Sequence, residues 1–336
     1  MKTKIKAAVT VALLLVFAET SLGQIRETAM PLNIYTDIND LASARFAWHG
    51  GDVIDIDPVM VPLAAGGAFT MPVPTASGKA VQSNKKATID YSNAKDGYVM
   101  VKFPQSTRKD LKVIIKGPSG TSYTYDLTPG IYEVFPLSDG NGTYTIGVYE
   151  QVQGTKYSVA NTATVKVTLA NEFAPFLISN QYVNFNKDNE VVKMAAQLTA
   201  GASGFTDKIA AVYNFVVNNF TYDKELARTV QSGYLPNLDQ VLRRRQGICF
   251  DYAAVMTAML RSLGIPCKLV VGYAGNVYHA WIDAYSQETG WVNQIIFFDG
   301  KNWTLMDPTF ASSANQSPEI MKYIGNGNNY RAMFLY

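Results

Sequence analysis

Cysteine and histidine are both rare in this chain, which has two of each among 336 residues. Cys249 stands in the stretch "RRRQGICFDYAAVMTAML" (residues 243–260), at the start of apolar residues that recur at helical spacing. A thiol in the first turn of a helix faces unpaired backbone N–H groups and the positive end of the helix dipole, which favour the thiolate. The same N–H groups can hold the oxyanion that forms when the thiolate attacks a carbonyl carbon. The position therefore predicts a nucleophilic cysteine.

A nucleophilic cysteine needs a base, and the two histidines are the candidates. His49 lies in "FAWHGGD", a glycine-rich turn, whereas His279 lies in "VYHAWIDAY", which has the pattern of a β-strand. A single histidine on a strand is more often a packed residue than a base. The scarcity of histidine and the cysteine at a helix start nevertheless favour His279 as the base.

Two aspartates are candidates for the group that orients the imidazole. Asp283 lies on the same face of its strand as His279, but four residues along a strand span about 13 Å, too far for contact without a bulge. Asp307 lies near the end of "NWTLMDPT", which follows a "DG" hairpin turn, so an adjacent antiparallel strand can bring it beside His279. We therefore favour Asp307, although an aspartate before proline also forms turns.

These residues and their surroundings resemble the transglutaminase-like superfamily, relatives of the papain-like thiol enzymes. The matching stretches are "NNFTYD", "GICFDYAAVMTAMLRSLGIPCKLVVGY", "YHAWIDAY" and "WTLMDPT", over about residues 190–312. The resemblance implies an α+β, papain-like core in which the helix that carries the cysteine packs on an antiparallel sheet. It also implies that Cys249, His279 and Asp307 form a catalytic triad, with no cofactor.

The resemblance extends to two aromatic residues near the triad. It places Tyr222 at the oxyanion side or in the pocket wall, although Tyr222 is equally plausible as a core residue whose hydroxyl is bonded. It makes Trp281 a packing residue or a wall of the substrate site.

The resemblance implies a thioester acyl-enzyme but leaves the substrate open. Members of the superfamily include protein crosslinkers, deamidases, proteases and peptidases, which differ in whether water or an amine resolves the thioester. We therefore predict a cysteine protease or an acyltransferase that acts on protein or peptide, including a cell-wall or surface protein. The alternative is a catalytically silent relative that serves in binding or adhesion at the cell surface.

The second cysteine, Cys267, bears on two further possibilities, a disulfide and a metal site. Cys267 is predicted to be a buried core residue, and a Cys249–Cys267 disulfide is the alternative. Two histidines and two cysteines at wide spacing cannot supply the close ligand pairs of a zinc site. We therefore predict no metal site.

Residues 1–23 have the pattern of a secretory signal peptide, with three lysines before the apolar run "AAVTVALLLVFA". Their removal takes away three lysines and one glutamate, so 26 basic and 26 acidic residues remain. A neutral chain gives no electrostatic reason to bind nucleic acid. The expected location is outside the cell, with no membrane span after removal of the signal.

Three segments follow the predicted signal peptide. Residues 24–80 are irregular and rich in proline and glycine, whereas residues 81–170 contain seven short β-type runs typical of an immunoglobulin-like β-sandwich. Residues 171–336 form the predicted transglutaminase-like domain, in which "LPNLDQVLRRRQG" indicates a short helix capped by Asn237. We expect the sandwich and the transglutaminase-like domain to fold separately.

Overall fold

The computed structural model describes residues 25–26, 69–287, 290–292, 296–298, 303–305 and 329–336. The predicted signal peptide, most of the irregular segment, His49 and Asp307 lie outside these residues. The described residues form a mixed α+β structure, as predicted. Within this part of the chain, no helix is long and apolar enough to span a bilayer.

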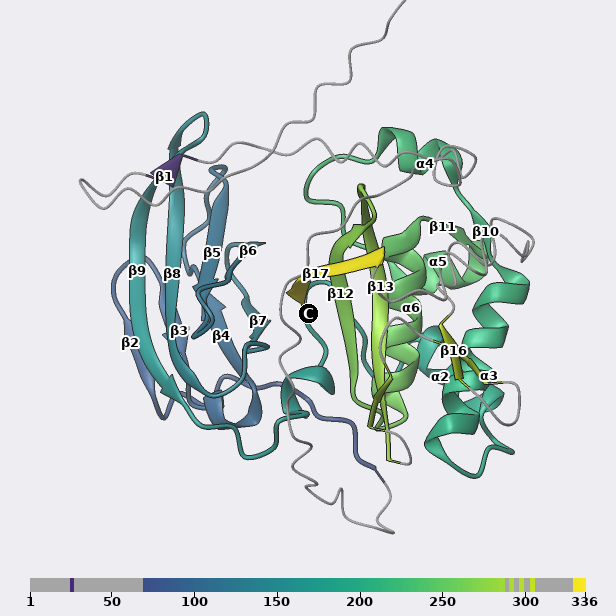
Figure 1. Ribbon diagram of the computed structural model, residues 1–336. Helices are drawn as coiled ribbons and strands as arrows, with labels where there is room; N and C mark the ends of the chain where they lie inside the picture. Colours follow the sequence, from purple (N-terminus) through teal and green to yellow (C-terminus); the bar gives the residue numbers. More distant parts are fainter. Residues whose placement is uncertain (1–24, 27–68, 288–289, 293–295, 299–302, 306–328) are drawn as a thin grey trace, which may run out of the picture.

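The β-rich part, residues 81–167, contains two antiparallel sheets with the strand orders β2-β3-β4-β7 and β1-β9-β8-β5-β6 (Figure 1). Its strands are β2 (Val81–Ser83), β3 (Thr88–Asp90), β4 (Tyr98–Lys102), β5 (Leu111–Lys116), β6 (Ser122–Asp126), β7 (Tyr132–Pro136), β8 (Gly142–Gln153) and β9 (Lys156–Val167), with β1 (Ile25–Arg26) paired to β9. Buried residues alternate along β5 and β6 because successive side chains point to opposite faces of a sheet. The immunoglobulin-like type and the domain limits stay predictions.

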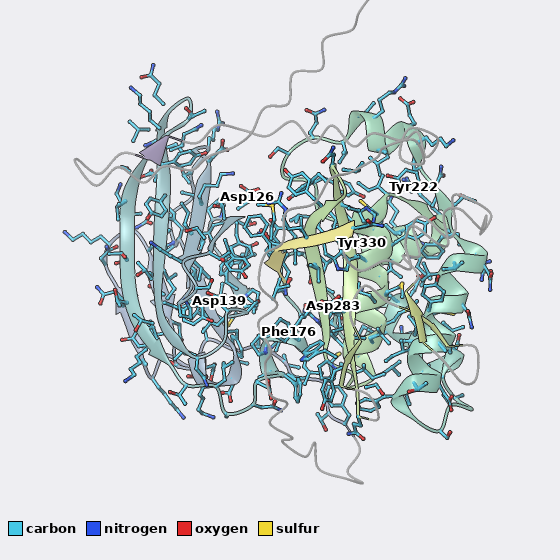
Figure 2. The ribbon with its side chains drawn as sticks, in the orientation of Figure 1. Asp126, Asp139, Phe176, Tyr222, Asp283 and Tyr330 are labelled. Atoms are coloured by element: carbon cyan, nitrogen blue, oxygen red, sulfur yellow. The ribbon has the colours of Figure 1, made fainter. Side chains whose placement is uncertain are left out.

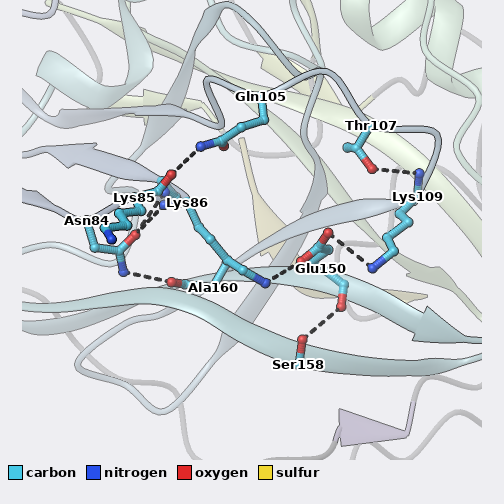
Figure 3. A network of polar contacts seen from close by, with 10 residues as sticks. Asn84, Lys85, Lys86, Gln105, Thr107, Lys109, Glu150, Ser158 and Ala160 are labelled. Carbon is cyan, nitrogen blue, oxygen red and sulfur yellow. Dashed lines mark hydrogen bonds and ion pairs between the residues drawn. The ribbon is translucent and has the colours of Figure 1, made fainter.

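Polar contacts connect the two sheets of the β-rich part (Figure 3). Lys86, between β2 and β3, lies 2.6 Å from Glu150 of β8, and Lys109 lies 3.3 Å from the other oxygen of that carboxylate. Asn84 donates a side-chain hydrogen bond to the Ala160 carbonyl of β9 at 2.8 Å. The hydrogen bond from Lys86 is the largest cause of a lowered pKa at Glu150. The contacts of Lys86 and Asn84 thus join the turn between β2 and β3 to the other sheet.

The α+β part contains a sheet of strand order β14-β13-β12-β17 and a group of helices. Its strands are β12 (Cys267–Ala274), β13 (Val277–Ser286), β14 (Gly290–Val292) and β17 (Tyr330–Leu335), and β15 (Ile296–Phe298) pairs separately with β16 (Trp303–Leu305). Its helices are α2 (Glu190–Leu198), α3 (Phe205–Asn219), α4 (Lys224–Thr229), α5 (Leu238–Arg244) and α6 (Cys249–Ser262). Figure 1 shows the helices on the side of this sheet that faces away from the β-rich part.

Helix α6 is the centre of the α+β part. It packs on β12 and β13 and is covered by α2, α3 and α5, so every residue from Cys249 to Arg261 except Phe250 is buried. Its alanines, methionines and single leucine allow neighbours to approach on all sides. The helix ends before Gly264, whose φ of +79° favours glycine and whose Cα is covered by the Phe69 ring.

Aromatic rings join the β-rich part to the α+β part. Tyr182, in the connecting segment, stacks on Tyr336 with ring centroids 4.0 Å apart, and Tyr125 of β6 meets Tyr336 edge-on at 5.8 Å. The fully buried Arg261 of α6 donates hydrogen bonds to the backbone oxygens of Cys267 and of two distant residues, Ile178 and Tyr336. The boundary between the two parts is therefore a packed interior.

Candidate active site

Cys249 is the first residue of α6 and is 2% exposed. The preceding residue, Ile248, has extended backbone, so the helix begins abruptly at the thiol. Cys249 and Cys267 are both free, which removes the disulfide alternative. Cys267 is fully buried with its sulfur 3.6 Å from the Thr257 hydroxyl, and burial raises the pKa of its thiol to about 12. Cys267 is thus a core residue, as predicted.

The backbone turn before Cys249 is held by a buried carboxylate. Asp251, fully buried in the first turn of α6, accepts a hydrogen bond from the Ile248 N–H at 2.8 Å and another from the Tyr234 hydroxyl at 2.7 Å. A Cβ atom on Gly247 would lie 2.5 Å from the Asp251 Cβ, so only glycine allows this approach. Burial is the main cause that raises the pKa of Asp251 to about 6.

Asp251 and Tyr234 were not among the residues singled out from the sequence. The available signal was local for Asp251, since an acidic residue in the first turn of a helix commonly bonds back to the N-terminal backbone. No comparable signal exists for Tyr234, which lies 17 residues earlier in the segment between α4 and α5.

Tyr222 lies next to the segment that leads to Cys249. Strand β10 (Thr221–Tyr222) pairs in parallel with β11 (Gln246–Gly247), and this register sets Tyr222 beside Gly247, two residues before the cysteine. The Tyr222 ring is half-buried and packs against the core (labelled in Figure 2). The structure thus brings Tyr222 into the neighbourhood of Cys249, and its catalytic role stays a prediction.

His279 lies on β13 and is 3% exposed. Its ring is roughly parallel to that of Trp281, with centroids 6.2 Å apart, and lies 6.5 Å from Tyr330 of β17. Trp281 is equally buried and meets Tyr330 edge-on at 5.3 Å. The partner of His279 across the sheet is Gly272, where an added Cβ would lie 2.9 Å from the Trp281 ring. Trp281 therefore packs beside His279.

Cys249 and His279 lie at the same end of the layer formed by α6 and β13. Thr257 of α6 contacts Cys267, and Cys267 pairs with Ala284 of β13. Thr257 and Ala284 therefore lie at about the same height in the layer. Cys249 lies eight residues before Thr257, or about 12 Å along a helix. His279 lies five residues before Ala284, or about 16 Å along a strand. Cys249 and His279 therefore lie at similar heights in the layer if α6 and β13 run in the same direction.

The chain connections give that direction. Only four residues separate the end of α6 from the start of β12, so the chain reverses between them, and β12 pairs antiparallel with β13. Helix α6 and β13 therefore run in the same direction. Cys249 and His279, near the starts of these two elements, consequently lie near the same end of the layer.

Of the two candidate aspartates, only Asp283 lies among the described residues. Asp283 is half-buried and lies opposite Lys268 across β12 and β13, where its charge acts to raise the pKa of that lysine against the larger, lowering effect of burial (Figure 2). Asp307 lies outside the described residues, so its selection over Asp283 stays a prediction.

Comparison with known proteins identifies the segment that contains Cys249 and His279. Residues 192–294 match the transglutaminase-like superfamily. The resemblance seen in the sequence is therefore confirmed for this transglutaminase-like segment, which runs from α2 through β14. Asp307 follows the matched residues.

Two curated relatives and one solved structure illustrate the similarity. The chain is 28% identical over 173 residues to the uncharacterized protein YebA of Bacillus subtilis, a match that covers 45% of this chain and 22% of the relative. It is 35% identical over 69 residues to a protein-glutamine gamma-glutamyltransferase of Pseudomonas aeruginosa, a match that covers 16% of this chain and 10% of the relative. The periplasmic domain of TgpA from Pseudomonas aeruginosa is similar with a TM-score of 0.32 and 15% identity, over 72% of this chain and 99% of that domain.

Each curated relative is much longer than the segment it shares with this chain. The match of residues 192–294 supports a transglutaminase-like fold around Cys249 and His279.

Proposed function

We propose that this protein is a thiol enzyme that acts on amide bonds of proteins or peptides through a thioester on Cys249. The observation that carries the proposal is the position of Cys249 as the first residue of α6, at the same end of the helix–sheet layer as His279, within the transglutaminase-like segment. A sulfur at a helix start lies beside backbone N–H groups that have no partner within the helix. These groups are suited to stabilise the oxyanion of a tetrahedral intermediate.

The proposed reaction has two stages. The Cys249 thiolate attacks the carbonyl carbon of the substrate amide, and the C–N bond breaks as the His279 imidazolium gives its proton to the departing nitrogen. Water or a primary amine then attacks the thioester and loses a proton to His279, while the C–S bond breaks and the thiolate is restored. Water yields hydrolysis or deamidation, and an amine yields a new amide bond.

Three further residues have proposed roles in the same site. Asp307 would orient the His279 imidazole and stabilise its charged form. Tyr222, whose strand lies beside Gly247, would line the oxyanion side of the site. Trp281, packed beside His279, would keep the imidazole in place and form a wall.

The proposed location is outside the cytoplasm, where the substrate would be a protein or peptide, including one attached to the cell wall or cell surface. The N-terminal signal pattern supports this location. A catalytically silent binding protein remains the opposing hypothesis, because a fold alone does not establish turnover.

Incubation of the protein with dimethylated casein, with and without monodansylcadaverine, separates these hypotheses. Mass spectrometry of the casein would detect cleavage, deamidation and amine incorporation in one experiment. We expect at least one of these products from the wild type and from Cys267→Ala, and none from Cys249→Ala. If Cys249→Ala and the wild type give equal amounts of product, Cys249 is not the nucleophile.

A further inference from the structure

The turn that presents Cys249 depends on two side chains outside the proposed triad. Asp251 lies two residues after Cys249, and its two carboxylate oxygens accept hydrogen bonds from different directions. One bond, from the Ile248 N–H, closes the first turn of α6 onto the residue that precedes the cysteine. The other comes from Tyr234, whose hydroxyl reaches the carboxylate from the segment between α4 and α5.

The packing around Asp251 leaves little room for movement. The side chain is fully buried, and its Cβ and carboxylate cover the Cα of Gly247. The Tyr234 ring packs edge-on against Phe250, the residue between Cys249 and Asp251, with centroids 6.3 Å apart. Contacts therefore hold the backbone on both sides of the cysteine.

We propose that Asp251 and Tyr234 are positioning residues that hold the turn of residues 247–249, and thereby the Cys249 sulfur, in the orientation needed for attack. The proposal rests on the proposed function, because it concerns the same nucleophile. Neither residue exchanges a proton with the substrate. Their effect follows from geometry, since a misplacement of about 1 Å at a reacting group costs on the order of 100-fold in rate.

One substitution at Asp251 should preserve both of its hydrogen bonds. In Asp251→Asn, the amide oxygen can accept the Ile248 N–H, and the amide nitrogen can donate to the Tyr234 hydroxyl, which then acts as acceptor. Both hydrogen bonds survive with one of them reversed. In Asp251→Ala both are lost, and in Tyr234→Phe only the second is lost.

Two other variants serve as matched controls. Asp239 occupies the first turn of α5, where its carboxylate accepts hydrogen bonds from the Val191 N–H at 3.1 Å and the Asn189 side chain at 2.8 Å. Asp239→Ala thus removes two similar bonds away from Cys249. The Tyr125 hydroxyl is buried with no hydrogen-bond partner among the described residues, so Tyr125→Phe removes a buried hydroxyl without breaking a bond.

The test combines steady-state kinetics on casein with the rate of alkylation of Cys249 by iodoacetamide, followed by peptide mapping. We expect Asp251→Ala to lower kcat about 100-fold and Tyr234→Phe about 10-fold, with KM changed less than about twofold. We expect Asp251→Asn, Asp239→Ala and Tyr125→Phe to keep kcat within about threefold of the wild type. Alkylation of Cys249 should slow in the same order.

Three results would overturn the proposal: an unchanged kcat in Tyr234→Phe, an equal loss of kcat in Asp239→Ala and Asp251→Ala, or a change confined to KM. If Asp251→Ala does not fold, Tyr234→Phe still decides. The alkylation rates require no substrate, so they test positioning even if the proposed activity on casein is absent.

Discussion

Replacement of Arg261 by methionine removes a buried cation that joins three segments of the chain. Its Nε donates to the Cys267 carbonyl at 2.9 Å, and its two terminal nitrogens donate to the carbonyls of Ile178 at 2.7 Å and Tyr336 at 2.5 Å. Burial lowers the pKa of Arg261 to about 10, so the guanidinium stays charged at neutral pH. Methionine keeps most of the volume and provides no donor.

The expected loss follows from the three carbonyls. The Tyr336 oxygen keeps the hydrogen bond from the Leu269 N–H at 3.0 Å, so the loss falls mainly on the Ile178 and Cys267 oxygens. A buried acceptor that loses its donor costs about 1–2 kcal/mol, which gives about 2–4 kcal/mol for these two. Relief from the cost of burying a cation offsets part of this sum. We therefore expect Arg261→Met to lower the free energy of unfolding by about 2–3 kcal/mol.

Urea denaturation followed by tryptophan fluorescence measures this difference, and Arg243→Met provides the control. Arg243 pairs with Glu190 at 2.7 Å, but its side chain is 59% exposed, so its loss should cost less than about 1 kcal/mol. If Arg261→Met loses no more stability than Arg243→Met, the three buried hydrogen bonds do not hold the segments together.

Three further predictions concern the pH dependence, the triad and the domain boundary. The pKa of Asp251 is about 6 in the folded state, above its ordinary value of 3.8, so the folded protein binds this proton more tightly than the unfolded chain. The stabilisation from this proton is therefore fully present below pH 4 and is lost as the pH rises through 6. In urea denaturation, the free energy of unfolding of Asp251→Asn should rise relative to that of the wild type by up to about 3 kcal/mol between pH 4 and 7. A difference between the two proteins that does not change with pH would contradict this assignment. Asp307→Asn should reduce kcat on casein far more than Asp283→Asn, and the reverse order would make Asp283 the orienting acid. A chain that starts at residue 187 should unfold at a lower temperature than one that starts at 171, because only the longer chain keeps Ile178 and Tyr182; equal melting temperatures by circular dichroism would show that these contacts are dispensable.

Local patterns in the sequence predicted the elements that carry the site. The helix at Cys249 was recognisable because its apolar residues recur at helical intervals. The short helix before it is capped, as predicted, by Asn237, whose side chain accepts the Gln240 N–H. The β-type runs between residues 81 and 170 all contain strands, because alternation and turn residues are local signals. Such signals depend on neighbours a few residues apart.

Contacts between distant residues were not predictable in the same way. Arg261 lies near the end of a helix, where arginine is usually solvated, and its burial is explained by carbonyls up to 83 residues away. The pairing of Tyr222 with Gly247 and the hydrogen bond from Tyr234 to Asp251 also depend on the tertiary fold. The expectation that the two parts fold separately took no account of the rings of Tyr125, Tyr182 and Tyr336, which pack together at the boundary between the parts.

A thioester on Cys249 can be observed by acyl transfer from p-nitrophenyl acetate. The protein would be mixed with the ester and quenched in acid during the first turnover, and peptide mass spectrometry would locate the acetyl group. We expect acetyl on Cys249 in the wild type, a much slower acylation in His279→Ala, and none at this position in Cys249→Ala. Acetylation of Cys267 in place of Cys249, or turnover by a folded Cys249→Ala protein at the wild-type rate, would contradict this expectation.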